Sequence, residues 1–399
     1  MKQKLSQKSI PAWSADRHLN QVVRAMPPSG IRRFFDLVSE MDGAISLGVG
    51  EPDFVTPWHV REACIYSLES GATHYTSNKG MPELREAICN QTRLDLGLDY
   101  DPAEEILITT GVSEAADLAF RATLNPGEDA IVPEPCYVAY TPDIVLAGGV
   151  ARTVPTRLED EFRLQPEDVA AAITEKSRAL LLSYPNNPTG AIMTRADLED
   201  LADVVVENDL LVISDEVYGK LSYSGNHVSF AQLEGMQERT VILNGLSKSH
   251  AMTGWRIGYA LGDPALVGAM TKVHQYTMLC APTMAQIAGL EAMQKGEEEM
   301  LHMRHEYDLR RRMFVSGLNR IGLDCFEPKG AFYAFPSVKS WGLSSEEFAE
   351  RLLREQKVAV VPGNVFGSSG EGFLRCSYAT SREELIEALD RIETFLAGL

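Results

Sequence analysis

Short apolar runs that alternate with helix-like segments limit most strongly what this chain can fold into. The apolar runs begin near residues 106, 129, 179, 210 and 240, and the segments between them have room for at least one helix. Residues 179–183, Ala-Leu-Leu-Leu-Ser, are typical of a buried strand. Strands that alternate with helices in this way predict an α/β fold.

The composition fits a large globular enzyme and argues against two classes of partner. The chain has 399 residues, 45% of them apolar, which is enough for one large domain and a smaller one. Asp and Glu number 56 against 37 Lys and Arg, so the net charge is −19 at pH 7. Nucleic acids and anionic membrane surfaces bind clustered basic residues, so we expect neither as a partner.

Targeting and metal-binding signals are missing from the sequence. The first eight residues carry lysines but lack the apolar core of a secretory signal, and no apolar run has the length of a membrane span. The six cysteines are far apart and form no CxxC motif, which indicates free thiols in a reducing compartment. His302 and His305 lie one helical turn apart, but their charged surroundings indicate a solvated helix. We therefore expect a cytoplasmic protein without a metal site.

The stretch with the most chemical content is residues 245–258, which follow the apolar run 240–243. Lys248 would lie just beyond the end of a strand, and a partly desolvated lysine can form a Schiff base with an aldehyde. Arg256 is a fixed cation suited to a phosphate. A lysine nucleophile with a phosphate anchor is what pyridoxal phosphate requires. Taken alone, a Ser-Lys pair after a strand is more often a solvated loop.

Three further positions need a partner on physical grounds. Asp215 ends an apolar strand, where a carboxylate is costly unless it is paired; a protonated pyridine nitrogen would pair with it, and a helix N-cap is the alternative. Arg375 lies inside an apolar strand and requires an anion. The strand 106–110, Gly111 and the helix that follows expose backbone N–H groups that can hold a phosphate, although many such junctions bind nothing.

Residues 245–258 resemble, position by position, the cofactor-attachment signature of class I/II aminotransferases of fold type I. The resemblance runs from about residue 31 to the C-terminus. It is strongest at residues 185–190, 214–218, 245–258 and 374–379. It implies a large domain with a mostly parallel seven-stranded sheet flanked by helices, and a smaller α+β domain. The implied division is an N-terminal segment that joins the small domain (1–48), a large domain that binds pyridoxal phosphate (49–284) and a small C-terminal domain that starts with a long bridging helix (285–399).

The same resemblance implies a set of cofactor contacts around Lys248, to which pyridoxal phosphate attaches. Asp215 would hold the ring nitrogen, Tyr137 would stack on the ring, and Asn187 and Tyr218 would bond its phenolic oxygen. Some members have a phosphate-binding serine where this chain has Gly245, and we expect Ser247 to compensate. The full set of implied cofactor residues is Gly111, Val112, Ser113, Tyr137, Asn187, Asp215, Tyr218, Ser247, Arg256 and, reaching in from the other subunit of a homodimer, Tyr75.

The implied reaction is transfer of an amino group. Arg375 would clamp the substrate carboxylate together with Asn187 and the Gly50 backbone, Ile31 would contact the side chain, and the Lys248 amine would move the Cα proton. The partner substrate would be a 2-oxo acid such as 2-oxoglutarate, with ping-pong kinetics. Residues 330–336 favour the aromatic and broad-range aspartate branch, so we lean to an aromatic or broad-range donor. Alanine, aspartate and N-acetyl-diaminopimelate donors stay open.

Two other functions compete with this interpretation. A β-lyase that acts on cysteine conjugates could use the same scaffold, and it would release pyruvate without a 2-oxo acid acceptor. A non-enzymatic regulator that senses pyridoxal phosphate would carry a DNA-binding module before this region. Only about thirty residues precede the matched region and the chain is acidic, so we do not expect a regulator.

Overall fold

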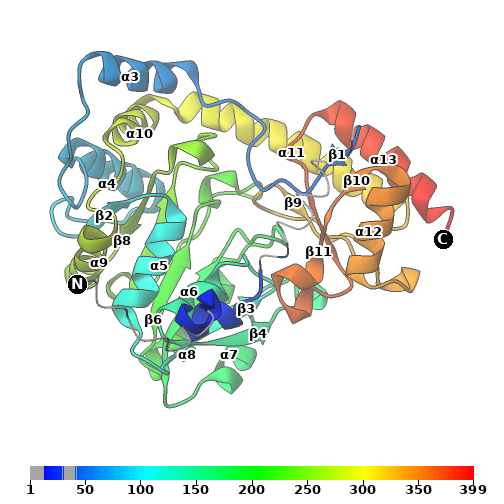
Figure 1. Cartoon of the computed structure of the whole chain (residues 1–399), viewed down its shortest axis with the longest axis horizontal. Helices are drawn as coiled ribbons and strands as arrows, with labels where there is room; N and C mark the ends of the chain where they lie inside the picture. The colour runs from blue at the N-terminus through cyan, green and yellow to red at the C-terminus, as the bar shows by residue number, and fades with distance from the viewer. Residues whose placement is uncertain (1–12, 29, 31–40, 42) are drawn as a thin grey trace, which may run out of the picture.

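The computed structural model describes residues 13–28, 30, 41 and 43–399. It shows a large central sheet covered by helices, with a second group of helices and short strands that contains the C-terminus (Figure 1). The helix expected near residues 31–38, and with it Ile31, falls outside the described residues.

The central sheet has seven strands, as the resemblance implied. Six strands run parallel, and β8 is antiparallel to both of its neighbours. The mostly parallel α/β architecture is therefore confirmed. In spatial order the strands are β2 (Ile106–Thr109), β8 (Gly258–Leu261), β7 (Thr240–Gly245), β6 (Leu211–Asp215), β5 (Ser177–Ser183), β3 (Asp129–Glu134) and β4 (Val150–Pro155).

The inner strands are buried on both faces, which explains why they are apolar without alternation. On β5, Ala179 and Leu181 enter one hydrophobic core while Leu180 and Leu182 enter another. Helices fill both sides, as an isolated parallel sheet cannot cover itself. The helices packed around this sheet are α3 (Trp58–Glu69), α4 (Pro82–Leu96), α5 (Val112–Thr123), α6 (Tyr140–Leu146), α7 (Pro166–Ala172), α8 (Arg195–Glu207), α9 (Pro264–Thr277) and α10 (Thr283–Lys295).

The C-terminal elements form a separate hydrophobic core. A three-stranded sheet in the order β11-β12-β9 packs with the long helix α11 and two more helices, and β1 pairs in parallel with β10. That pairing sets residues 45–46 beside the C-terminal elements; the boundaries expected at residues 48 and 284 stay predictions. The elements are β1 (Ile45–Ser46), α11 (Glu297–Arg320), β9 (Tyr333–Ala334), α12 (Ser345–Gln356), β10 (Val358–Ala359), β11 (Val361–Pro362), β12 (Leu374–Ser377) and α13 (Arg382–Leu396), besides the short N-terminal helix α1 (Gln21–Ala25).

Two predicted elements differ from the structure. The long helix expected from residue 283 to about 318 is two helices, α10 and α11, which meet at Gly296. A Cβ at Gly296 would lie 2.7 Å from the Ala292 carbonyl oxygen and 2.9 Å from His250 Cδ2, so the joint packs too tightly for any side chain. The strands expected over residues 324–338 reduce to the two residues of β9.

Candidate active site

A cavity of about 540 Å³ lies where β5, β6 and β7 end and α5 begins. This edge of a parallel sheet is where α/β folds bind ligands, since loops at the carboxyl ends of the strands converge there. The cavity brings together most of the residues that the sequence singled out. Those residues are Gly50, Val112, Ser113, Tyr137, Asn187, Asp215, Tyr218, Ser247, Lys248, Arg256 and Arg375.

Lys248 presents its amine to this cavity just past the end of β7. The Nζ atom donates a hydrogen bond of 2.7 Å to the Gly50 carbonyl oxygen. Burial lowers the lysine pKa from 10.5 to about 8, because the charged form loses its hydration; Glu51 opposes this shift and Arg375 adds to it. An amine that titrates near pH 8 is available both as a nucleophile and as a base.

Asp215 ends β6 on the cavity wall and is buried. Tyr140 donates a 2.8 Å hydrogen bond to its Oδ2, and the Val217 backbone N–H donates one of 3.1 Å to its Oδ1. Burial raises the pKa of Asp215 to about 6 although both hydrogen bonds oppose the rise. The side chain caps a tight turn and not a helix, so the N-cap alternative is wrong. Lys248 offsets part of this burial, but no cation of the described residues forms an ion pair with the carboxylate.

Tyr140 is a site residue that the sequence analysis missed. Its hydroxyl joins Asp215 to the Ser183 hydroxyl, 2.9 Å away, and Ser183 also lines the cavity. Tyr140 lies three residues after Tyr137, and the two rings meet edge to face with centroids 5.6 Å apart. A second polar aromatic three positions beyond a predicted contact was the available signal, because such spacing brings side chains to one face.

Tyr218 and Tyr333 form a second pair in the cavity. Their hydroxyls lie 2.7 Å apart, and both side chains are buried. Burial and the neighbouring phenol keep the pKa of Tyr218 well above its usual value, so the hydroxyl keeps its proton. Tyr333 belongs to β9, far along the chain, and the sequence analysis assigned it no role in the site.

Arg375 lies on β12 with its guanidinium between the Tyr333 and Phe366 rings, 4.7 and 4.9 Å from their centroids. One nitrogen donates to Asn187 Oδ1 at 3.1 Å and another to the Gly48 carbonyl oxygen at 2.5 Å. The Nε atom is buried without a hydrogen-bond partner, and among the described residues no carboxylate pairs with this cation. A buried arginine in this state is ready for an anionic ligand.

The third cation, Arg256, lies beside the N-terminus of α5. Gly111 caps that helix without a side-chain hydrogen bond, and a Cβ there would lie 2.5 Å from the Arg256 guanidinium. Gly258 is equally constrained, as its Cβ would lie 2.7 Å from the Val112 nitrogen. Gly111 lets the guanidinium approach the free N–H groups of the first helical turn, and Gly258 lets β8 pack against the same peptide. Ser113 and Ser247 line the cavity there. Cationic and N–H donors together form a phosphate cradle.

Gly245, where some aminotransferases carry serine, has no room for a side chain. A Cβ would lie 2.9 Å from the Ile257 carbonyl oxygen and 3.0 Å from Val112 Cγ2. The packing between β7 and β8 therefore explains this departure. Ser247, on the same loop, lines the cavity as expected.

Three predicted residues do not line the cavity. Gly111 lies directly behind the Arg256 guanidinium, Tyr75 is 81% exposed, and Ile31 lies outside the described residues. Among the residues with described positions, no helix is long and apolar enough to cross a bilayer, and no cluster of three or more His, Cys, Asp or Glu side chains could hold a metal ion.

The fold and the site together define an α/β protein in which a lysine amine, an arginine beside a helix N-terminus and a second buried arginine share one cavity. Comparison with known proteins gives the family. The profile of the aminotransferases of class I and II matches residues 42–392, and the chain belongs to this family. It is an aminotransferase of fold type I, a family that generally uses pyridoxal phosphate.

The similarity to individual relatives extends over nearly the whole chain. A Bacillus subtilis protein named YugH is 52% identical over 95% of this chain and 98% of its own, and an aspartate aminotransferase of Pyrococcus abyssi is 45% identical over 92% and 96%. The crystal structure of an aromatic aminotransferase from Pyrococcus horikoshii superposes with a TM-score of 0.88 at 44% identity, covering 92% of this chain and 99% of that one.

Proposed function

We propose that this aminotransferase binds pyridoxal phosphate at Lys248 and exchanges an amino group between an L-amino acid, aromatic or broad in range, and a 2-oxo acid such as 2-oxoglutarate. The observation that carries the proposal is the position of the Lys248 amine in one cavity with Asp215 and Arg375. The two half-reactions would share this cavity, so the kinetics would be ping-pong.

The residues present fit the cofactor at each of its ends. Arg256 and the first turn of α5, between Gly111 and Ser113, suit its phosphate. Asp215, buried without an ion pair among the described residues, suits a protonated ring nitrogen, which would stabilise the carboxylate and lower its pKa. Asn187 and Tyr218 offer polar groups to the ring oxygen, and Tyr137 offers a ring face.

When bound, pyridoxal phosphate supplies an aldehyde carbon and a ring that withdraws electrons from the substrate Cα. Lys248 supplies the amine that holds the cofactor and, once released, a base whose pKa of about 8 suits proton transfer near neutral pH. Its contact with the Gly50 carbonyl keeps the Nζ atom inside the cavity.

Arg375 orients the substrate. The guanidinium is held flat by two rings and by Asn187 and Gly48, so it presents a fixed plane to the α-carboxylate. A bidentate contact with such a plane fixes the direction of the Cα–H bond relative to Lys248.

The charges in the cavity support a donor with an uncharged side chain. Among the described residues that line it, the cations are Lys248, Arg256 and Arg375, and each already has a role. A second carboxylate on the substrate would find no further cation there. Relatives that are named aspartate aminotransferases and others named aromatic aminotransferases both match well, so this charge balance is the argument for the aromatic or broad-range class.

An absorbance titration tests the proposal. The cofactor-loaded protein is mixed with single amino acids, and no 2-oxo acid is present. We expect the band of the lysine-bound cofactor to convert to that of pyridoxamine phosphate, fastest with aromatic amino acids. Release of pyruvate and ammonia, with the original band retained, would instead establish the β-lyase. Conversion by aspartate alone would refute the substrate class.

A further inference from the structure

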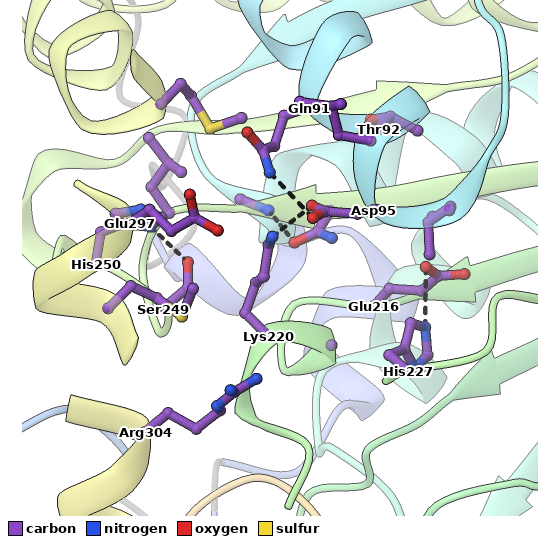
Figure 2. A pocket seen from close by; sticks show the side chains of 18 of the residues that line it. Gln91, Thr92, Asp95, Glu216, Lys220, His227, Ser249, His250, Glu297 and Arg304 are labelled. Atoms are coloured by element: carbon purple, nitrogen blue, oxygen red, sulfur yellow. Dashed lines mark hydrogen bonds and ion pairs between the residues drawn. The ribbon is translucent and has the colours of Figure 1, made fainter. Parts of the chain in front are cut away.

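A second cavity, of about 300 Å³, lies behind the Lys248 loop (Figure 2). Its walls come from the end of α4, the loop after β6, residues 244–246 and 249–250, and the region where α10 meets α11. It shares no lining residue with the first cavity within the described chain. The mechanism proposed above uses none of its side chains.

Most charges in this cavity are already paired. Lys220 forms an ion pair with Asp95, and Glu216 lies 3.0 Å from His227 while its other oxygen accepts hydrogen bonds from two serines. His250 is neutral at pH 7, because burial lowers its pKa to about 4. These pairs are visible in Figure 2 on the side of the cavity opposite α11 and across its centre.

Two charges remain, and both belong to α11. Glu297, exposed at the rim, and the half-buried Arg304 have no hydrogen-bond or ion-pair partner among the described residues, whereas the three arginines at 310–312 of the same helix each have one. They are seven residues apart, so they lie on one face of the helix about 10 Å apart along its axis. Long side chains on a helix lean towards its N-terminus, which brings the guanidinium of Arg304 closer to Glu297.

The surface between these two charges is apolar. Met300 and Leu301 occupy the intervening positions on the same face, and Met293 and Leu246 line the cavity beside them. The wall formed by α11 therefore presents an acid, an apolar patch and a base in that order. A ligand complementary to it carries an ammonium, a carboxylate and an apolar group.

We propose that this second cavity binds a zwitterionic amino acid with an apolar side chain. Its carboxylate binds Arg304, its ammonium binds Glu297, and its side chain packs on Met300 and Leu301. A simple anion is a poorer ligand, since it would leave Glu297 unpaired beside it. The volume of the cavity is at the lower end of the range for small-molecule sites, as an amino acid requires.

Calorimetric titration of the borohydride-reduced holoenzyme tests the proposal. Reduction makes the Lys248–cofactor bond permanent, so an amino acid cannot react in the first cavity. The probes are L-leucine, L-methionine, L-phenylalanine and 4-methylpentanoate, which is leucine without its amino group. We expect at least one amino acid to bind once per chain, and Arg304→Gln and Glu297→Gln each to weaken that binding about tenfold or more, as loss of a charge-assisted hydrogen bond does.

The matched controls are Arg320→Gln and Glu298→Gln, which change exposed residues of the same helix outside the cavity and should bind as the unaltered protein does. The proposal is overturned if no amino acid binds, if both cavity variants bind normally, or if 4-methylpentanoate binds as tightly as leucine. Failure of the proposed cofactor attachment would show separately, as borohydride would then leave the absorbance spectrum unchanged.

Discussion

Burial moves Lys248 and Asp215 towards their neutral forms, to pKa values of about 8 and about 6. Both groups are costly to bury in a cavity without a ligand, and both become useful once a ligand with an aldehyde and a cationic nitrogen is present. Two shifted pKa values in one cavity therefore indicate a site that binds a ligand.

Replacement of Lys248 by alanine should abolish turnover. The variant loses both the covalent attachment and the base, so we expect kcat to fall by about 10⁴-fold or more. Absorbance spectra should show that pyridoxal phosphate still binds but without the lysine-bound band. Lys272→Ala, on the exposed face of α9, is the control and should be fully active. Normal turnover in Lys248→Ala would refute the assigned role.

Asp215 should make the stability of the cofactor-free protein depend on pH. Because its pKa is raised from 3.8 to about 6 in the folded state, the folded protein binds the extra proton between these values. The free energy of unfolding should then fall as pH rises from 4 to 6, by on the order of 2–3 kcal/mol. Urea denaturation should show this component in the unaltered protein and not in Asp215→Asn.

Loading with pyridoxal phosphate supplies the check on that result. A cationic ring nitrogen would favour the ionised carboxylate, so the fall in stability between pH 4 and 6 should disappear in the loaded protein. An unchanged pH dependence after loading would contradict the pairing of Asp215 with the ring.

The sequence predicted the site residues that stand in loops directly after strands. Lys248, Asp215 and Asn187 could be found because strand ends meet at one edge of a parallel sheet. Tyr140 and Tyr333 could not, because a tyrosine among apolar residues is compatible with an ordinary core position, whereas the charge of Arg375 in an apolar strand required a partner. Which distant elements reach the cavity depends on how the two hydrophobic cores pack together, and local patterns do not carry that information.

At the scale of elements, the joint between α10 and α11 is the feature that the sequence pattern concealed. Helical spacing of apolar residues continues across Gly296. Because a single glycine is tolerated inside a helix, it did not indicate a helix boundary. The break follows from close contact with Ala292 and with His250 on the Lys248 loop. The two-residue strands β1 and β9 were similarly hard to predict, since such short segments have no periodicity to detect.

Gly296→Ala should destabilise the protein. The added methyl group would contact a backbone oxygen and a buried histidine ring, at an expected cost of about 1–3 kcal/mol in the free energy of unfolding. Gly268→Ala in α9 is the matched control. Its Cβ would meet no atom within 4 Å, so it should be neutral or stabilise by up to about 1 kcal/mol. Thermal denaturation of both variants distinguishes them, and equal melting temperatures would count against a tight joint.

At the scale of the whole molecule, we expect a homodimer in which Tyr75, exposed in the single chain, reaches the cofactor of the other subunit. Light scattering should then give twice the 44.0 kDa of one chain. Tyr75→Phe should weaken cofactor binding about tenfold, through loss of one hydrogen bond to a charged phosphate. A mixed dimer of Lys248→Ala and Tyr75→Phe chains should contain one intact site and recover native cofactor affinity in it. A mixed dimer without recovery would contradict a tyrosine shared between subunits.

Two short segments, residues 215–219 and 247–250, form the wall between the two cavities. In the first segment, Asp215 and Tyr218 line the first cavity while Glu216 and Gly219 line the second. In the other, Ser247 and Lys248 line the first cavity while Ser249 and His250 line the second. Substitutions in these two segments that are meant to alter substrate preference will therefore change the shape of both cavities at once. Val138 and Thr253 line the first chamber alone and are the better positions for libraries that aim at new substrates.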